Sequence, residues 1–206
     1  MIILLDRAWD ILVRNRYPYF ALNILYYGLI ILLMAYAAFN TSLQDRVLQS
    51  SGPLYMGGAL LMNEKTAVDD EVIKGLGMTF LVNVLGASYG NITLPSFVIP
   101  FAGIFLGLYR AIMIGIVFSP FNADIRQIIV PHLPTLFIEG QACVLAMLGA
   151  YIQGRAMIWP KSIGQTSRWK AYVEGVRQTG TLYMFIMAIL FISAIYGVIE
   201  VALLIG

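Results

Sequence analysis

Two isolated charged residues lie within long apolar stretches of the chain, where a charge is energetically unfavourable. Arg110 is the one charged residue of the stretch 96–118. Glu139 is the one charged residue of the stretch 134–154. A charge in hydrocarbon costs at least about 2.5–3.5 kcal/mol, so it normally faces the interior of a helix bundle and finds a partner. The pattern predicts either a buried ion pair that sets the register of two helices, or part of an ion or proton path.

Small residues place both charges on helix-packing faces. Gly103 and Gly107 are four residues apart, and their ridge continues to Arg110 at helical spacing. A second ridge begins three residues after Glu139 and comprises Ala142, Ala146, Ala150 and Gly154. Such ridges let helix backbones approach closely in a membrane. If the two helices are antiparallel, Arg110 and Glu139 also lie at similar depth, because they are equally far from the middle of the intervening turn.

Residues 86–90, Gly-Ala-Ser-Tyr-Gly, match the Gly-x-Ser-x-Gly pattern of serine hydrolases, for which His132 would be the base. A nucleophile and its base must be in hydrogen-bond contact. The expected topology instead places Ser88 and His132 at opposite ends of their spans, roughly 30 Å apart. We therefore predict no catalytic residue and interpret Gly86 and Gly90 as a third packing ridge.

Metal and cofactor chemistry are not indicated either. One histidine, one cysteine and scattered carboxylates provide no metal-ligand spacing, and no glycine-rich phosphate loop is present. The chain is therefore expected to need no cofactor and not to be an enzyme. Asn83 is the remaining polar candidate. Its amide is expected to reach backbone exposed by Gly103 across a tight turn at Pro95, a packing contact.

The elements that must position these residues are membrane-spanning helices. The chain is 60% hydrophobic and only 12% charged, with several continuous apolar runs of spanning length. Continuous runs favour helices over a barrel, because a helix satisfies its backbone within the span. We predict an all-α, polytopic helical bundle in which residues 1–206 form one membrane domain. Its five spans are expected near 17–39, 75–91, 96–118, 134–154 and 181–205.

Two further segments complete this prediction. Residues 1–16 have apolar side chains at helical spacing with charges largely on the other side, which predicts an amphipathic helix lying on the membrane surface. The turn 119–130 lies between Pro120 and Pro131 and is expected to form a short interfacial helix.

Lysine and arginine predict the orientation. The first seventeen residues hold three basic residues and the loop 155–180 holds five, whereas the loops on the opposite side hold four, together with six acids. Basic loops stay in the cytoplasm. We therefore expect a cell-membrane protein with a cytoplasmic N-terminus and an extracytoplasmic C-terminus. The net charge of +2 is too small to indicate a nucleic-acid partner.

The sequence Pro131-His132-Leu133-Pro134, which leads into an acidic span rich in small residues, resembles the stage II sporulation protein M family of membrane proteins. Tyr109-Arg110 and the asparagine-containing segment 80–86 extend the resemblance over roughly 75–159. Relative to that family, Leu133 replaces a glycine and the acid appears at Glu139 instead of one helical turn after the histidine. The resemblance implies a non-enzymatic membrane scaffold, since the sporulation member anchors peptidoglycan-cleaving enzymes.

Two functions follow from these expectations. The first is a membrane scaffold that anchors or assembles partner proteins, within a homo-oligomer or a heteromeric complex, because several small-residue ridges exceed what one short chain can pack. The second is a small transporter or channel component with a polar path lined by Arg110, Glu139 and His132. A scaffold keeps those side chains dry and mutually satisfied, whereas a conduit has a water-filled cavity that reaches a membrane face.

Overall fold

The computed structural model describes residues 2–50, 77 and 80–205. Within those residues all regular structure is helical and no strand is present. The elements are α1 (Ile2–Arg14), α2 (Arg16–Ala38), a helix over residues 41–50, the π-helix η1 (Val82–Thr93), α5 (Leu94–Val98), α6 (Ala102–Val117), α7 (Ala123–Ile158), the 3₁₀ turn η2 (Pro160–Ile163) and α8 (Arg168–Ile205). Most of the predicted connection 40–74 and the start of the predicted span 75–91 lie outside the described residues.

Among the described residues, three helices are long and apolar enough to cross a membrane: Arg16–Ala38, Ile129–Ile158 and Arg168–Gly197. They contain most or all of the predicted spans 17–39, 134–154 and 181–205. The all-helical class and the presence of spanning-length apolar helices are therefore confirmed. Helix α6 is apolar but has only 16 residues, so a count of five spans stays a prediction.

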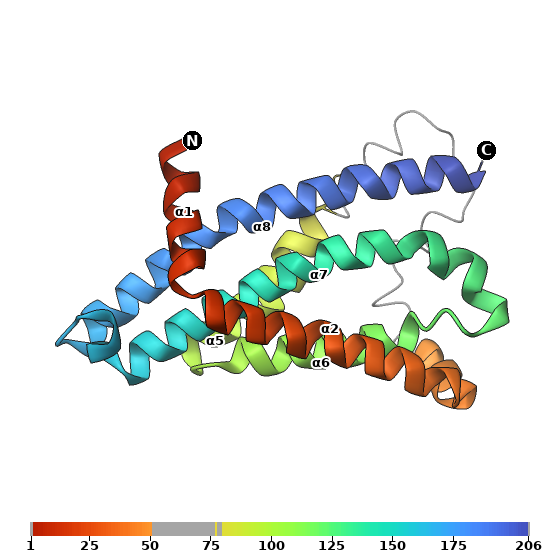
Figure 1. Cartoon of the computed structure of the whole chain (residues 1–206), viewed down its shortest axis with the longest axis horizontal. Helices are drawn as coiled ribbons and strands as arrows, with labels where there is room; N and C mark the ends of the chain where they lie inside the picture. Colours follow the sequence, from red (N-terminus) through yellow and green to blue (C-terminus); the bar gives the residue numbers. More distant parts are fainter. Residues whose placement is uncertain (1, 51–76, 78–79, 206) are drawn as a thin grey trace.

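The elements run back and forth along one long axis (Figure 1). The start of α2, the reversal between α5 and α6, and the α7–α8 connection lie toward one end. The helix 41–50, the α6–α7 connection and the C-terminus lie toward the other end. Helix α1 stands at an angle to α2 and packs against α8. Its charged residues Asp6, Arg7, Asp10 and Arg14 are all exposed.

Helix α7 is the centre of the bundle. Of its spanning window, 67% is buried inside the protein, compared with 22% for α2 and 28% for α8. It packs against α8, α2, α6 and η1. Small side chains permit this, since Ala142, Ala146 and Ala150 are fully buried. Close approach of four neighbours to one helix requires such small residues on its surface.

The two predicted ridges meet at Gly103. A Cβ atom at this position would collide with the backbone oxygen of Ile92 and would lie 2.9 Å from the Cβ of Ala150. At Gly154, the same addition would lie 2.6 Å from the ring of Phe101. A larger residue at Gly103 or Gly154 would therefore force its neighbours to move. Gly107 packs in the same way against Met147.

The third ridge is not a packing face in the described part of the chain. Gly86 is exposed. A Cβ at Gly90 would meet only the backbone of Leu85, one turn earlier in its own helix. The spacing of these glycines was sufficient for a ridge, but η1 is a π-helix, whose wider turn changes which residues share a face.

The predicted tight turn at Pro95 is wrong. Pro95 lies in the first turn of α5, and α5 continues directly from η1, so the helix runs past this proline at the cost of one backbone hydrogen bond. The chain reverses at residues 99–101 instead, and Phe101 adopts a left-handed φ of 66°. A phenylalanine rarely takes this conformation. Its ring packs against Tyr151, Trp159 and Gly154, which holds the reversal in place.

Helices α7 and α8 also extend beyond the predicted spans. The turn predicted over 119–130 is mostly the beginning of α7, and half of the loop predicted over 155–180 is the beginning of α8. Pro131 and Pro134 lie inside α7 rather than before it. Each proline removes a backbone hydrogen-bond donor, and its ring clashes with a carbonyl of the preceding turn, which bends the helix. In Figure 1 the N-terminal part of α7 turns away from the rest of the helix.

Candidate functional site between helices α7, α8 and η1

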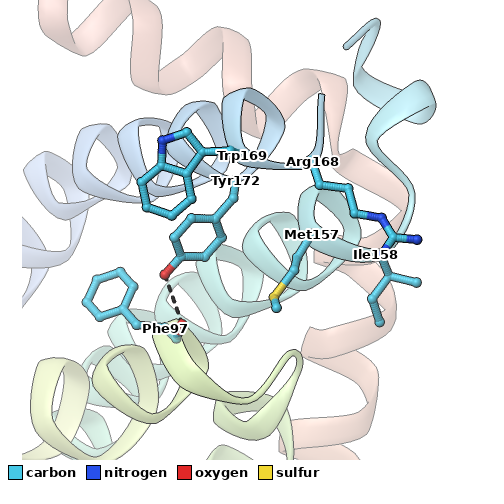
Figure 2. Close-up of a pocket in the computed structure, with 6 residues that line it drawn as sticks. All are labelled: Phe97, Met157, Ile158, Arg168, Trp169 and Tyr172. Atoms are coloured by element: carbon cyan, nitrogen blue, oxygen red, sulfur yellow. Dashed lines mark hydrogen bonds between the residues drawn. The ribbon is translucent and has the colours of Figure 1, made fainter. Parts of the chain in front are cut away.

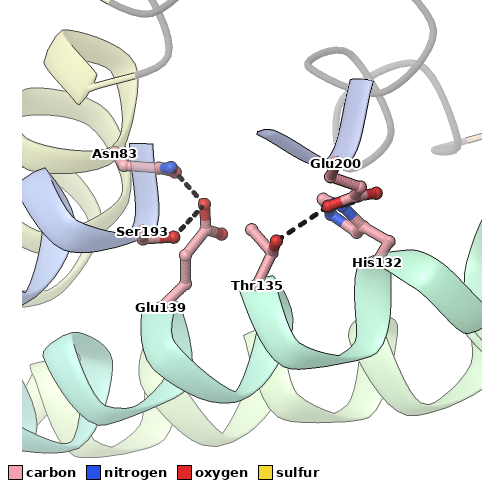
Figure 3. Close-up of polar contacts among 6 residues, drawn as sticks. All are labelled: Asn83, His132, Thr135, Glu139, Ser193 and Glu200. Carbon is pink, nitrogen blue, oxygen red and sulfur yellow. Dashed lines mark hydrogen bonds and ion pairs between the residues drawn. The ribbon is translucent and has the colours of Figure 1, made fainter. Parts of the chain in front are cut away.

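Polar side chains line one face of α7 where it meets α8. His132, Thr135 and Glu139 are spaced by three and four residues, so they share a helical face. Ser193 and Glu200 are seven residues apart on α8, which also places them on one face. Figure 3 shows the two rows pointing toward each other, with Asn83 of η1 beside Glu139.

The first cluster is centred on Glu200. The Nδ1 atom of His132 lies 3.1 Å and 3.2 Å from its two carboxylate oxygens. The hydroxyl of Thr135 donates to the same carboxylate at 2.9 Å. Glu200 is 8% exposed and His132 is 18% exposed. The imidazole also stacks on the ring of Phe118, with centroids 5.5 Å apart. Within the described residues, the side-chain contacts of this carboxylate thus come from α7.

The second cluster is centred on Glu139. Asn83 donates its side-chain N–H to Oε1 of this carboxylate at 2.6 Å. The hydroxyl of Ser193 lies 3.5 Å from the same oxygen, at the outer limit of a hydrogen bond. Glu139 therefore joins η1, α7 and α8. The expectation that Asn83 contacts Gly103 is wrong, because its amide binds Glu139 and the Gly103 N–H donates to Ser96 instead.

Arg110 lies close enough to act on the second cluster electrostatically. Its charge interacts with Glu139, with Tyr26 and with Cys143. His132 also acts on Glu139 through space. The structure therefore brings the four polar residues expected from the sequence, Asn83, Arg110, His132 and Glu139, into one region. A direct Arg110–Glu139 ion pair stays a prediction.

A third polar group joins α7 to α2 through Gln141. Tyr19 donates to the side-chain oxygen of Gln141 at 2.9 Å. The side-chain N–H groups of Gln141 donate to Asn23 at 2.9 Å and to Tyr27 at 3.0 Å. Tyr27 donates in turn to the backbone oxygen of Phe137 at 2.8 Å. Every residue of this group comes from one of two helices, so the group fixes how α2 and α7 pack.

The serine of the Gly-x-Ser-x-Gly segment lies apart from the histidine's contacts. Ser88 is buried, and its hydroxyl has no hydrogen-bond partner among the described residues. His132 is engaged by Glu200 and Phe118. No three histidine, cysteine or carboxylate side chains in the described ranges lie close enough together to hold a metal ion.

Two cavities lie away from these clusters. The first has a volume of about 560 Å³ and is lined by Phe97, Met157, Ile158, Arg168, Trp169 and Tyr172 (Figure 2). Tyr172 donates to the backbone oxygen of Phe97 at 2.9 Å and so ties α8 to α5. The second cavity, of about 460 Å³, is mostly polar. Neither is lined by Arg110, His132, Glu139 or Glu200.

Sequence reasoning missed Glu200, Thr135 and Ser193. Glu200 is the one charged residue of the stretch 181–205. A single charge in an apolar stretch is the same signal that identified Arg110 and Glu139, so Glu200 could have been identified from the sequence. Thr135 and Ser193 carry no such signal, because an isolated hydroxyl in an apolar helix can equally bond its own backbone.

Comparison with protein-family models, with curated proteins and with solved structures finds no match for this chain. The resemblance to the stage II sporulation protein M family therefore stays a prediction drawn from the segments around Arg110 and His132. What the site does must be argued from its own geometry.

Proposed function

We propose that this protein is a non-enzymatic integral membrane scaffold that anchors or assembles partner proteins at the cell membrane. The three spanning-length apolar helices support the membrane location. The alternating run of the elements and the distribution of lysine and arginine support a cytoplasmic N-terminus and an extracytoplasmic C-terminus. The sequence resemblance points to the same role.

One observation carries the proposal: the polar groups of the two clusters between α7, α8 and η1 engage one another. Glu139 accepts from Asn83 and Ser193, and Glu200 is held by His132 and Thr135. Satisfied polar clusters in a helix bundle fix register and orientation, because each group loses its partner if a helix slides or rotates. A rigid interior with this arrangement suits a protein that presents a fixed outer surface.

That outer surface is apolar and extensive. The large apolar side chains more than half exposed along α2, α6 and α8 include Phe20, Ile24, Ile31, Phe105, Phe191 and Ile192. In a membrane these positions meet lipid or another protein. A scaffold uses part of such a surface for its partners, or for a second copy of itself.

A second function, a small transporter or channel component, is favoured by one specific observation. Two carboxylates and a histidine lie along the contact between α7 and α8, and His132 acts electrostatically on Glu139. Acidic residues and histidine in series are the components of proton relays. In this reading the two clusters are successive positions on a path that opens transiently.

A flux assay on reconstituted protein separates the two functions. For a scaffold, liposomes containing the protein acidify no faster than empty liposomes under an imposed potential and pH gradient. For a conduit, they acidify faster, and Glu139→Gln and Glu200→Gln both abolish the excess. Glu174→Gln is the matched control, since Glu174 lies on α8 outside both clusters. Excess flux with this pattern overturns the scaffold proposal.

Site-specific photo-crosslinking tests the scaffold directly. A photoreactive residue at Ile24, Phe105 or Ile192 is expected to give a discrete, reproducible protein adduct in native membranes from at least one exposed position. The same residue at Ile186, which is fully buried, serves as the control and gives none. A protein that is a monodisperse monomer in mild detergent, and that forms no adduct in native membranes from any exposed position, contradicts the proposal.

A further inference from the structure

A polar cavity of about 460 Å³ lies where α1 meets the α7–α8 connection. Four arginines line it: Arg7 and Arg14 from α1, Arg155 from the end of α7, and Arg177 from α8. The carboxylates in its lining are those of Asp10 and Glu174. The cavity is therefore built from α1 and from the distant region where α7, η2 and α8 follow one another, and its lining carries more positive than negative charge.

The arginines are not neutralised by these carboxylates. No arginine nitrogen of the cavity lies within 4.0 Å of Asp10 or Glu174, all six side chains being among those the structure describes. Glu174 instead accepts a hydrogen bond from Gln178 at 3.1 Å. Four arginines and two carboxylates, all within the described residues, thus line one cavity, and no ion pair joins them.

Arg155 is the best placed of the four to hold an anion. Its Nε atom is buried and has no hydrogen-bond partner among the described residues. Its guanidinium lies 5.6 Å from the ring centroid of Tyr151, which limits the orientations it can take. Burial of a charged guanidinium without a compensating partner is costly, and an anion in the cavity that pairs with its charge offsets that cost.

We propose that this cavity binds a phosphate group, carried either by the headgroup of an anionic lipid or by free phosphate. Guanidinium groups match phosphate oxygens in pairs, and several arginines around one phosphate add both affinity and geometric selectivity. The site lies at the end of the bundle that holds the N-terminus of α2 and the α7–α8 connection (Figure 1). In the proposed orientation this end faces the anionic cytoplasmic leaflet.

The surface of α1 favours the lipid as the source. Trp9 and Val13 are 59% and 44% exposed, on the same helix as two of the arginines. An interfacial helix with exposed apolar side chains and basic residues binds anionic membrane surfaces. A headgroup phosphate in the cavity would then fix α1 against α8 at the level of the headgroups.

The test uses the full chain in detergent with two probes. Native mass spectrometry compares retention of phosphatidylglycerol with that of phosphatidylcholine. Thermal unfolding compares inorganic phosphate with chloride at matched ionic strength. Preferential retention of phosphatidylglycerol identifies a lipid headgroup, and a saturable stabilisation by inorganic phosphate identifies a free anion. Either result supports the proposal only if it depends on the arginines of the cavity.

The variant Arg155→Gln/Arg177→Gln is expected to weaken binding of the probe by about tenfold or more for each arginine, the factor that follows from losing one charge-assisted hydrogen bond. The charge-matched control is Arg46→Gln/Arg126→Gln, at the opposite end of the bundle. If the first variant unfolds, Arg177→Gln alone is used, because Arg177 is exposed. Equal retention of both lipids with no phosphate-specific stabilisation, or equal loss in both variants, overturns the proposal.

Discussion

The Nδ1 atom of His132 lies 3.1 Å from Oε1 of Glu200, across 68 positions of sequence and between the two longest helices of the protein. Thr135 completes the contact from the next turn of α7. This pairing holds the last part of α8 against the bent part of α7, at the end of the bundle away from the α7–α8 connection. It therefore acts as a second attachment between helices that the connection joins only at the other end.

Removing Glu200 is expected to destabilise the protein. Glu200→Leu leaves the Thr135 hydroxyl and one nitrogen of His132 without an acceptor, and a buried polar group without a partner costs about 1–3 kcal/mol. The double variant His132→Leu/Glu200→Leu is expected to lose less stability than the sum of the two single variants. Unfolding in detergent, followed for all four proteins, measures this coupling. Strictly additive losses would show that the two residues do not stabilise one another.

Arg110 and Glu139 make a second coupled pair in our account. Arg110→Met or Glu139→Leu strands the other charge, which typically costs about 3–5 kcal/mol when a buried pair is broken. The double variant replaces both by apolar residues of similar volume and is expected to be milder than either single change. Thermal stability of the three variants in detergent tests this prediction. A double variant as unstable as the sum of the singles would show that the charges act independently.

Asn83 provides an internal check on that pair, because it donates to Glu139 at 2.6 Å. In Asn83→Leu, the carboxylate keeps its electrostatic interaction with Arg110 but loses its shortest hydrogen bond. We expect a loss of about 1–3 kcal/mol, and no further loss when Asn83→Leu is added to Glu139→Leu. A large further loss would mean that Asn83 stabilises the bundle by some other contact.

The close approach of α6 to its neighbours depends on Gly103. Gly103→Ala places a methyl group against the backbone of Ile92 and 2.9 Å from the Cβ of Ala150, and overpacking of this kind costs about 1–3 kcal/mol. Gly28→Ala in α2 is the matched control, since nothing lies within 4 Å of its new methyl group. The control should leave the melting temperature unchanged or slightly raised. Equal effects of the two substitutions would rule out the packing described for α6.

Membrane topology can be measured by cysteine accessibility. In a Cys143→Ala background, a cysteine at Lys161 is expected to react with an impermeant reagent only from the cytoplasmic side. A cysteine at Glu64, which lies outside the described residues, is expected to react only from the opposite side. We expect Cys143→Ala to be tolerated because it changes the volume of this buried side chain only slightly. Reaction of both cysteines from the same side would overturn the five-span topology.

Part of this fold follows from composition and local pattern. The predicted span 17–39 corresponds to α2 (Arg16–Ala38) almost residue for residue, because a continuous apolar run in lipid must satisfy its backbone internally. The small-residue ridges likewise predicted a close contact that occurs between Gly103 and Ala150. In both cases the information is local, since it lies within one helix and its spacing.

Prolines showed the limit of local signals. Pro95, Pro131 and Pro134 were all interpreted as boundaries, yet each lies within a helix. A proline costs one hydrogen bond and bends the helix, but it ends the helix only if nothing else supports the following turn. For α7, packing against α8 and η1 supplies that support. Whether a proline breaks or bends a helix is thus decided by contacts made elsewhere.

Partner choice was decided by the tertiary structure alone. The sequence indicates that Arg110, Glu139 and Glu200 are charges at apolar depth, which means that each must find a partner in the interior. It does not specify how far each helix is rotated about its axis. A rotation by the angle between two successive residues already moves a side chain to a different neighbour. Packing of all the helices together sets those rotations. That is why Glu139 meets Asn83 and Ser193, and why Glu200 meets His132 and Thr135.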